Sequence, residues 1–426
     1  MKKSDYKIHI VGAGVSGLIA AQVLENYGYH PIIIESTDSV GGRVKSDIIE
    51  GYILDHGFQV LLSSYPAAKK YLDYTKLNLQ EFLEGATIFK KGKSETIGDP
   101  LRNLHFLLPT MFASIGSVAD KVKILNLNNR LKKKSIEAIF KDEEKTTLLY
   151  LKDFGFSNDI INNFFKPFFS GIFLEPDLST SSRMFEFIYK MFGDGLAMIP
   201  KKGMQAIPNQ LKDNLKNTTF LFNTTVEEVL DNEIKTVKGK TIKSHMTIIA
   251  SEASSLISNL KNQETNWKSC DTLYFETDTR IINKPIIGLI AEDNALINSI
   301  FYPTSIATST KGNKELLSVT IVKPHNLSKD QLIEKVQQEL NEHCKIKNTR
   351  FLKRYVIKKA LPHLTNIQYE ISNTETKLKP TIFLAGDQLL NGSLNAAMIA
   401  GERAALGVIK ALEDGLIVDE LTSEHK

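Results

Sequence analysis

The chain has 426 residues, of which 42% are hydrophobic and 24% charged, and its formal net charge is +4 at pH 7. That length and apolar content suffice for about two domains with buried cores, and a small net charge without a long basic tract argues against a nucleic-acid-binding protein. The two cysteines, Cys270 and Cys344, stand far apart and outside any CxxC motif, so we expect a reducing, cytoplasmic environment and no metal site. No run of about 18 apolar residues predicts a membrane span.

The first predicted elements are a strand, a glycine turn and a helix. The strand-like run Lys7 to Val11 leads into the motif Gly12-Ala13-Gly14-Val15-Ser16-Gly17, and the residues from Val15 to Tyr27 have helical apolar spacing. In such a unit Gly12 permits a tight turn, Gly14 lets the backbone approach a pyrophosphate, and Gly17 lets the helix pack closely on the strand. The amides around Val15 and Ser16 supply donors and a partial positive charge for phosphates. The motif therefore predicts a dinucleotide site.

A second predicted strand, Pro31 to Ile34, ends in Glu35, which Ser36 follows. The carboxylate comes about 20 residues after the glycines, the interval at which it accepts hydrogen bonds from a ribose. The run Gly41-Gly42-Arg43 comes next. We expect it to bring free amides and a fixed cation to the pyrophosphate, because a guanidinium binds phosphate oxygens with two parallel hydrogen bonds.

With these motifs the chain resembles the FAD-dependent amine oxidase superfamily, which includes protoporphyrinogen oxidases and phytoene desaturase-like enzymes. The resemblance implies that the cofactor is FAD. It also implies an α/β fold, in which a Rossmann-like FAD-binding domain is interleaved with an α+β substrate domain of mixed sheet and helices. We expect residues 1–85, 195–255 and 360–426 to form the FAD-binding domain. Residues 86–194, mostly helical, and 256–359, mostly strands, would form the substrate domain.

The segment Leu54 to Val60 follows at the spacing at which this family brings the chain back under the flavin. The resemblance implies that Gly57 lets the backbone approach the ring, with Phe58 and Gln59 beside it. Gln59 and His56 are polar groups expected within reach of the substrate or the flavin edge, although a histidine here also suits a hydrogen-bonded structural role. The segment looks more like those of desaturases and protoporphyrinogen oxidases than like those of monoamine oxidases.

Two apolar stretches have two interpretations. Leu101 to Val118 is apolar and interrupted by proline, and Phe164 to Leu174 is dense in phenylalanine. Such clusters usually form the core of packed helices. They also suit an apolar substrate tunnel, because ligand pockets are largely apolar, and a mouth that makes a peripheral contact with a membrane.

The middle of the chain predicts a short helix and several short strands. Gly203 to Pro208 precedes a helix, and strand-like runs follow, including Thr219 to Phe222 and Thr225 to Leu230. Thr247 to Ala250 has the composition of a buried parallel strand. This region resembles the family's small β-meander, which implies that the backbone of Val226 meets the adenine.

Near the end, the apolar strand Thr381 to Ala385 leads into Gly386-Asp387, and a helix of small residues begins at about Asn395. The resemblance implies that Asp387 binds the ribityl chain, and that the N–H groups near Leu394, Asn395 and Ala396 face the flavin N1 and O2 edge. A helix N-terminus stabilises negative charge there. The loop before the helix, residues 391–395, has no Tyr or Trp, whereas amine oxidases carry an aromatic residue that helps to cage the amine.

Together these observations predict an FAD-dependent oxidoreductase that removes a hydride from an organic, hydrophobic small molecule and passes the electrons to oxygen or another acceptor. No side-chain acid or base stands out. Lys284 and Lys323 are candidates for the family's flavin-adjacent lysine. Three alternatives stay open: an amine or amino-acid oxidase, a redox-neutral flavin isomerase, and a non-catalytic flavin-binding protein.

Overall fold

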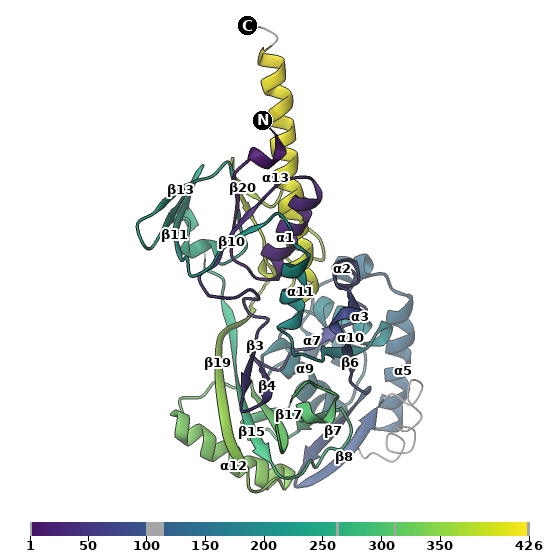
Figure 1. Ribbon diagram of the computed structural model, residues 1–426. Helices are drawn as coiled ribbons and strands as arrows, with labels where there is room; N and C mark the ends of the chain where they lie inside the picture. The colour runs from purple at the N-terminus through teal and green to yellow at the C-terminus, as the bar shows by residue number, and fades with distance from the viewer. Residues whose placement is uncertain (1, 99–114, 261–263, 311, 424–426) are drawn as a thin grey trace.

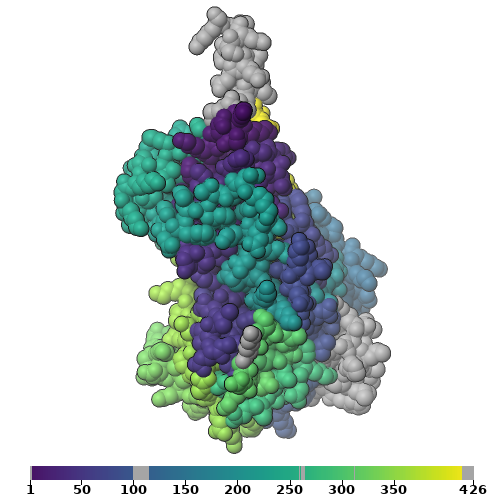
Figure 2. Space-filling view, viewed as in Figure 1, coloured from purple at the N-terminus to yellow at the C-terminus, as the bar shows by residue number. Residues whose placement is uncertain are grey.

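The computed structural model describes residues 2–98, 115–260, 264–310 and 312–423. The upper part of the molecule in Figure 1 is built around a mostly parallel sheet, and the lower part around a second, mixed sheet. In Figure 2, residues from the N-terminus, in purple, lie against residues from the middle of the chain, in teal, in the upper part of the molecule. Segments remote in sequence therefore share one layer. The apolar stretch Leu101 to Val118 falls largely outside the described residues.

The upper sheet has six strands in the order β10-β2-β1-β14-β21-β20. All neighbours are parallel except β20, which runs antiparallel to β21. The strands are β1 (Ile8–Val11), β2 (Ile32–Ile34), β10 (Thr219–Leu221), β14 (Met246–Ile249), β20 (Lys377–Lys379) and β21 (Ile382–Leu384). The predicted parallel strand at Thr247 to Ala250 is thus confirmed. The predicted strand at Thr219 to Phe222 is also present, as β10, and it extends the main sheet next to β2.

Two helices pack closely on this sheet and on each other: α1 (Val15–Asn26) and α13 (Leu394–Ser423). Their glycines explain the close approach. A Cβ at Gly17 would lie 2.1 Å from the backbone oxygen of Gly12, and one at Gly401 would lie 2.2 Å from the backbone oxygen of Ser16. The small residues of both helices therefore bring the first and last helices together at the sheet.

Three small sheets complete the fold, and in one of them Tyr52 and Leu54 pack with Tyr274 and Leu316 of the lower sheet. The antiparallel β-meander follows β10 along the chain, and its first strand begins at Val226. Its strands are β11 (Val226–Leu230), β12 (Glu233–Thr236) and β13 (Thr241–Lys243). The other two sheets comprise β3 (Ser46–Ile49) with β4 (Tyr52–Asp55), and β5 (Leu61–Leu62) with β9 (Ala197–Pro200) and β6 (Leu79–Glu81).

The lower sheet has seven strands in the order β19-β15-β18-β17-β16-β7-β8. They are β7 (Gly85–Lys90), β8 (Lys93–Gly98), β15 (Trp267–Thr277), β16 (Ile287–Ile290), β17 (Ile297–Phe301), β18 (Glu315–Ile321) and β19 (Arg350–Pro362). The hairpin β7–β8, which we did not predict, joins the sheet by a parallel pairing of β7 with β16. Strand β19 runs through the expected domain boundary at residues 359 and 360, because it pairs along almost its whole length with β15.

Helices cover both parts. The short helices beside the upper sheet are α2 (Pro66–Tyr71), α3 (Tyr74–Leu77) and α11 (Ala206–Asn214). The helical group and the helix on the lower sheet comprise α5 (Val118–Lys133), α6 (Ile136–Lys141), α7 (Thr147–Asp153), α8 (Asn158–Ile160), α9 (Lys166–Phe173), α10 (Ser182–Asp194) and α12 (Lys329–Cys344). A π-helical turn, Ile161–Phe165, joins α8 to α9. The 3-10 turns are Lys3–Asp5, Ala253–Ser255, Ser258–Leu260, Pro303–Ser305 and Asp387–Leu389.

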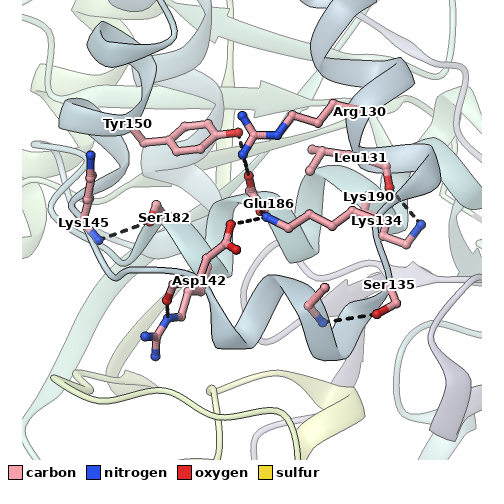
Figure 3. Close-up of polar contacts among 12 residues, drawn as sticks. Arg130, Leu131, Lys134, Ser135, Asp142, Lys145, Tyr150, Ser182, Glu186 and Lys190 are labelled. Atoms are coloured by element: carbon pink, nitrogen blue, oxygen red, sulfur yellow. Dashed lines mark hydrogen bonds and ion pairs between the residues drawn. The ribbon is translucent and has the colours of Figure 1, made fainter.

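One buried carboxylate ties the helical group together. Glu186 on α10 is 2% exposed and accepts a hydrogen bond from the hydroxyl of Tyr150 at 2.7 Å. Lys134 and Arg130 form ion pairs with the same carboxylate. Figure 3 shows these side chains converging on Glu186 from separate helical segments. A charge this deeply buried requires such partners, so the cluster fixes α5 against α10.

Candidate functional site

A large cavity runs from the upper sheet to the lower one. Its volume is about 1720 Å³, and its lining includes Val11 and Ile34 at the ends of β1 and β2, as well as Ser299 and Thr320 on β17 and β18. Small-molecule pockets usually measure roughly 300–1,000 Å³, so this cavity has room for a large cofactor together with a substrate. Of the predicted site residues, 16 line it: Gly12, Gly14, Val15, Ser16, Glu35, Ser36, Gly41, Gly42, Arg43, Gly57, Phe58, Gln59, Val226, Gly386, Asp387 and Leu394.

The glycine turn forms one end of the cavity. Gly12 has a φ of +108°, and a Cβ there would lie 3.0 Å from the backbone oxygen of Ala250, so the turn needs glycine on both grounds. A Cβ at Gly14 would meet no described atom within 4 Å. The backbone at Gly14 is therefore open toward the cavity, at the N-terminus of α1. Gly17 does not line the cavity, because it faces Gly12 and lets α1 pack on the strand.

The second glycine pair packs against the first. The N–H of Gly41 donates to the backbone oxygen of Ala13 at 2.9 Å, and Gly14 and Gly41 form a parallel bridge. A Cβ at Gly41 would lie 2.4 Å from the backbone oxygen of Val44. The two glycine segments thus form one cradle of exposed backbone.

Glu35 is 8% exposed and lies at the end of β2 beside this cradle. Its Oε2 accepts from the N–H of Ala13 at 2.8 Å, and its Oε1 accepts from the N–H and the hydroxyl of Thr37, each at 2.9 Å. The hydroxyl of Ser36 also donates to Oε1, at 3.2 Å. These contacts fix the carboxylate. Oε1 accepts three of the four hydrogen bonds and Oε2 only one, so a lone pair of Oε2 remains for a further donor such as a hydroxyl.

Arg43 and Asp387 pair with each other across the cavity wall. The guanidinium Nη1 donates to Asp387 Oδ2 at 3.0 Å, and Nη2 forms an ion pair with Oδ1. Nη1 also donates to the backbone oxygen of Ala360 at 3.3 Å, and the guanidinium lies 5.1 Å from the ring centre of Trp267. The side chain of Asp387 is 5% exposed. The pair is therefore a rigid, partly buried junction between the two ends of the chain.

At the start of α13, Ser393 caps the helix. Its hydroxyl accepts from the N–H of Ala396 at 3.0 Å, so this N–H, which we expected to face the flavin, donates to the cap instead. Asn395 is fully buried and its Oδ1 accepts from the N–H of Ala67 at 2.9 Å, so its side chain fastens α2 to α13. Neither residue lines the cavity, whereas Leu394 does. The first amides of a helix have no acceptor within it, so a donor role of the Leu394 and Asn395 amides toward the flavin stays a prediction.

The segment after β4 is fixed by its own contacts. The side-chain amide of Gln59 donates to the backbone oxygens of Arg43 and His56, at 2.9 and 3.0 Å. Nε2 of His56 lies 2.9 Å from Asp47 Oδ2, and its ring lies 4.3 Å from that of Tyr355. Both polar groups that we expected to reach the substrate are thus engaged with the protein, although both residues line the cavity.

Phe58 belongs instead to an aromatic group. Its ring centre lies 6.0 Å from that of Phe82 and 5.3 Å from that of Phe301. Gly57 has a φ of +96°, which lets the backbone turn toward the cavity.

The phenylalanine segment contributes both to the core and to the cavity lining, while its role as a substrate tunnel stays a prediction. Phe165 and Phe169 are at most 1% exposed and belong to the main core. Phe164, Phe168 and Phe169 line the cavity, and the rings of Phe164 and Phe168 stack with centres 5.6 Å apart. Residues of α10 complete this apolar wall, among them Met184 and Phe192.

Lys268 is a cavity residue that sequence reasoning missed. It lies near the start of β15, and its Nζ donates to the hydroxyl of Thr180 at 2.8 Å. Burial lowers the pKa of its amine, partly opposed by Glu175. Of the lysines we had considered, neither Lys284 nor Lys323 lines the cavity, and Nζ of Lys323 donates to two backbone oxygens elsewhere. No sequence signal singled it out, because strand β15 mixes polar and apolar residues.

Among the described residues, no group of three or more His, Cys, Asp or Glu side chains could bind a metal ion. No helix in that part of the chain is long and apolar enough to cross a bilayer. Both cysteines are free and buried.

The residues present fit FAD. The glycine cradle leaves open backbone at a helix N-terminus, as a pyrophosphate needs, and Glu35 lies beside it for a ribose. Val226 at the start of β11 and Leu394 at the N-terminus of α13 line the same cavity, and a helix N-terminus stabilises negative charge.

Comparisons with known proteins also indicate a flavin-binding protein. A family model described as "Flavin containing amine oxidoreductase" matches residues 15–409. Protoporphyrinogen oxidase 2 of Arabidopsis thaliana is 29% identical over 174 residues, which cover 39% of this chain and 32% of that protein. The L-amino-acid oxidase BmooLAAO-I of Bothrops moojeni is 35% identical over 98 residues, 22% of this chain and 20% of that protein. The chain thus matches a third or less of these relatives' lengths.

A solved oxidoreductase from Methanosarcina mazei has the same fold, with a TM-score of 0.70 at 16% identity over 96% of this chain and all of that one. The alignments with the two curated oxidases are partial, whereas the family model matches nearly the whole sequence. The chain therefore belongs to the family of flavin-containing amine oxidoreductases, whose members are FAD-dependent oxidoreductases.

Proposed function

We propose that the protein binds FAD in the large cavity and uses it to remove a hydride from a hydrophobic organic substrate. The observation that carries this proposal is the continuity of the cavity, which joins the glycine cradle at one end to the phenylalanine wall at the other. Bound FAD supplies a ring that accepts a hydride. The protein supplies the position of the substrate, the exclusion of water and the charges around the ring.

We assign the cofactor to residues from three segments. Gly12, Gly14, Gly41 and Gly42 form the cradle for the pyrophosphate, with the amides of Val15 and Ser16 at the head of α1. Glu35 accepts hydrogen bonds from the ribose, with Ser36 beside it, and the backbone of Val226 meets the adenine. Gly386 and the amides of Leu394 and Asn395 face the flavin, and Gly57 and Phe58 lie beside the flavin ring. We keep residues 1–85, 195–255 and 360–426 as the FAD-binding domain and 86–194 and 256–359 as the substrate domain, with β19 (Arg350–Pro362) crossing the boundary at residue 360.

Arg43 and Asp387 act together in this proposal. Asp387 accepts a hydrogen bond from the ribityl chain, and Arg43 holds the carboxylate in place while its charge lies near the pyrophosphate. Gln59 holds the backbone of Arg43 through the hydrogen bond to its oxygen.

The substrate would lie against the apolar wall. Phe164, Phe168 and Phe192 are large side chains that exclude water and offer no hydrogen bonds. Lys268 is a partly buried amine in the same cavity and donates to the hydroxyl of Thr180. Because its pKa is lowered, it exchanges a proton more readily than a solvated lysine, which suits a role in proton transfer beside the reacting centre.

An amine or amino-acid oxidase is the second candidate, since a matched relative is an L-amino-acid oxidase. Against it, the loop at residues 391–395 carries no Tyr or Trp. The phenylalanine wall also favours an apolar substrate over a charged amine.

The test is spectroscopic. The purified protein should be yellow, and anaerobic addition of polyenes, porphyrinogens, amines and L-amino acids should show which class bleaches the flavin bands. Bleaching by an apolar compound supports the proposal. Bleaching by amines or amino acids alone, with peroxide formed in air, supports the second candidate. A yellow protein that no substrate bleaches would indicate a non-catalytic flavoprotein.

A further inference from the structure

Helix α5 exposes an apolar stripe. Of the nine exposed large hydrophobic residues in the described part of the chain, three lie on this helix. Val118 is 78% exposed, Val122 is 51% exposed and Leu125 is 42% exposed. Their spacing of four and three residues places them on one face of the helix. A clustered apolar face of this kind marks an interaction surface more often than scattered single residues do.

The opposite face of α5 is firmly anchored. Leu127 and Leu131 are buried in the main core, and the hydroxyl of Ser117 caps the first turn. At the other end, Arg130 and Lys134 turn inward to Glu186, as Figure 3 shows. The outward orientation of the stripe is therefore set by packing and ion pairs.

The exposed face is positively charged. It continues from the apolar stripe through Asn129 to Lys132 and Lys133, all exposed. Asp120 is the only carboxylate among residues 118–133. It is fully buried and accepts hydrogen bonds from Ser117 and Ser157. The outward charge is therefore not balanced within the helix.

The same face borders the cavity. Leu125, Asn129 and Lys132 also line it, as does Asn128 one turn away. The stripe and the cavity thus meet along one edge of α5, so a surface that contacts the stripe also lies beside residues of the cavity lining.

We propose that this face of α5 docks the protein on an anionic lipid bilayer. Val118, Val122 and Leu125 enter the boundary between headgroups and acyl chains, while Lys132 and Lys133 contact acidic headgroups. An amphipathic helix with basic residues binds such a surface through the burial of its apolar side chains and through the attraction of its cations to anionic lipids. Each Lys near the surface strengthens the binding roughly five- to tenfold. A hydrophobic substrate then passes from the lipid into the cavity. Only this last step rests on the proposed function.

The experiment is co-sedimentation of the FAD-loaded full chain with vesicles. One set consists of phosphatidylcholine alone, and the other of phosphatidylcholine and phosphatidylglycerol in equal amounts. The test variants are V118D/V122D and K133E, at positions that do not line the cavity. The matched controls are V237D and K238E, on the exposed turn between β12 and β13, where Val237 is 62% exposed. In Figure 1 this turn lies at the upper left, remote from α5 at the lower right.

We expect binding to the anionic vesicles, at least fivefold weaker binding for K133E, and loss of binding for V118D/V122D, with the controls unchanged. The absorbance of bound flavin shows, independently of vesicle binding, whether each variant is folded and loaded with FAD. No sedimentation of the yellow protein with anionic vesicles overturns the docking proposal and leaves the proposed function intact. Equal binding to both vesicle types, or equal losses in the test and control variants, overturns it as well.

Discussion

The guanidinium of Arg43 and the carboxylate of Asp387 form a two-point ion pair although 344 residues separate them in the sequence. Arg43 follows the second glycine pair, and Asp387 follows the last strand of the main sheet. The pair therefore joins the part of the cavity assigned to the AMP half of FAD to the part assigned to the flavin. Since the side chain of Asp387 is 5% exposed and that of Arg43 39% exposed, the carboxylate depends on this partner more than the guanidinium does.

Removal of Arg43 should weaken cofactor binding. In R43A the buried carboxylate of Asp387 loses its charged partner and its fixed orientation, so we expect FAD to bind about tenfold more weakly or worse. In R43K one charge remains without the planar fork, so the loss should be intermediate. Titration of the apoprotein with FAD, followed by fluorescence quenching, measures this. Equal affinity in R43A and the parent protein would contradict the assignment.

Two glycines of the same motif should respond differently to alanine. A Cβ at Gly14 points into open space, so G14A should fold with unchanged stability in the apo form and lose FAD affinity. A Cβ at Gly17 would lie 2.1 Å from the backbone oxygen of Gly12, so G17A should lower the free energy of unfolding by roughly 1–3 kcal/mol. Urea unfolding of both apoproteins, with flavin content of the purified forms, separates the two effects. Full flavin retention by G14A would refute the cradle.

Lys268 should act in the reaction and not in cofactor binding. K268M removes the partly buried amine from the cavity, so we expect the anaerobic reduction of the bound flavin to slow about tenfold or more, with the flavin content unchanged. K323M is the matched control, because Lys323 does not line the cavity. Stopped-flow absorbance with a bleaching substrate gives both rates. Similar rates for K268M and K323M would exclude the assigned role.

The buried imidazole of His9 should make the free energy of unfolding sensitive to acid. Burial, with smaller contributions from Lys7 and His245, lowers its pKa from 6.5 to about 4 in the folded chain. Between these two values the unfolded chain binds a proton that the folded chain does not. Lowering the pH therefore lowers the free energy of unfolding, by up to roughly 3 kcal/mol. H9N should lessen the dependence between pH 6.5 and 4 in urea unfolding at a series of pH values. A slope as steep in H9N as in the parent protein would assign the effect to other groups.

Local patterns were sufficient for the elements around the glycine motifs. The strand at Ile8 to Val11, the helix from Val15 and the strand ending before Glu35 follow from apolar spacing and three glycines, each of which has one dominant steric reason. The phenylalanine segment was ambiguous for a physical reason. A helix with apolar side chains on most faces contacts the core and the cavity at once, and the spacing of its apolar residues does not show which face contacts which.

Contacts between remote segments were not predictable in the same way. The hairpin β7–β8 pairs with β16, which lies nearly 200 residues further along the chain, and nothing in its own sequence identifies that partner. Lys268 became a candidate only when β15 was placed beside the cavity. The N–H of Ala396 was assigned to a cofactor because the sequence did not reveal that Ser393 would cap the helix.

The sequence by itself determined the cofactor class, because the glycine turn, the acidic strand end and the late Gly-Asp motif each impose a local geometry that few residue types permit. Only the tertiary structure decided which polar groups remain free in the cavity. That outcome depends on which remote donors and acceptors meet when the two ends of the chain fold together, and Arg43 with Asp387 is its clearest example.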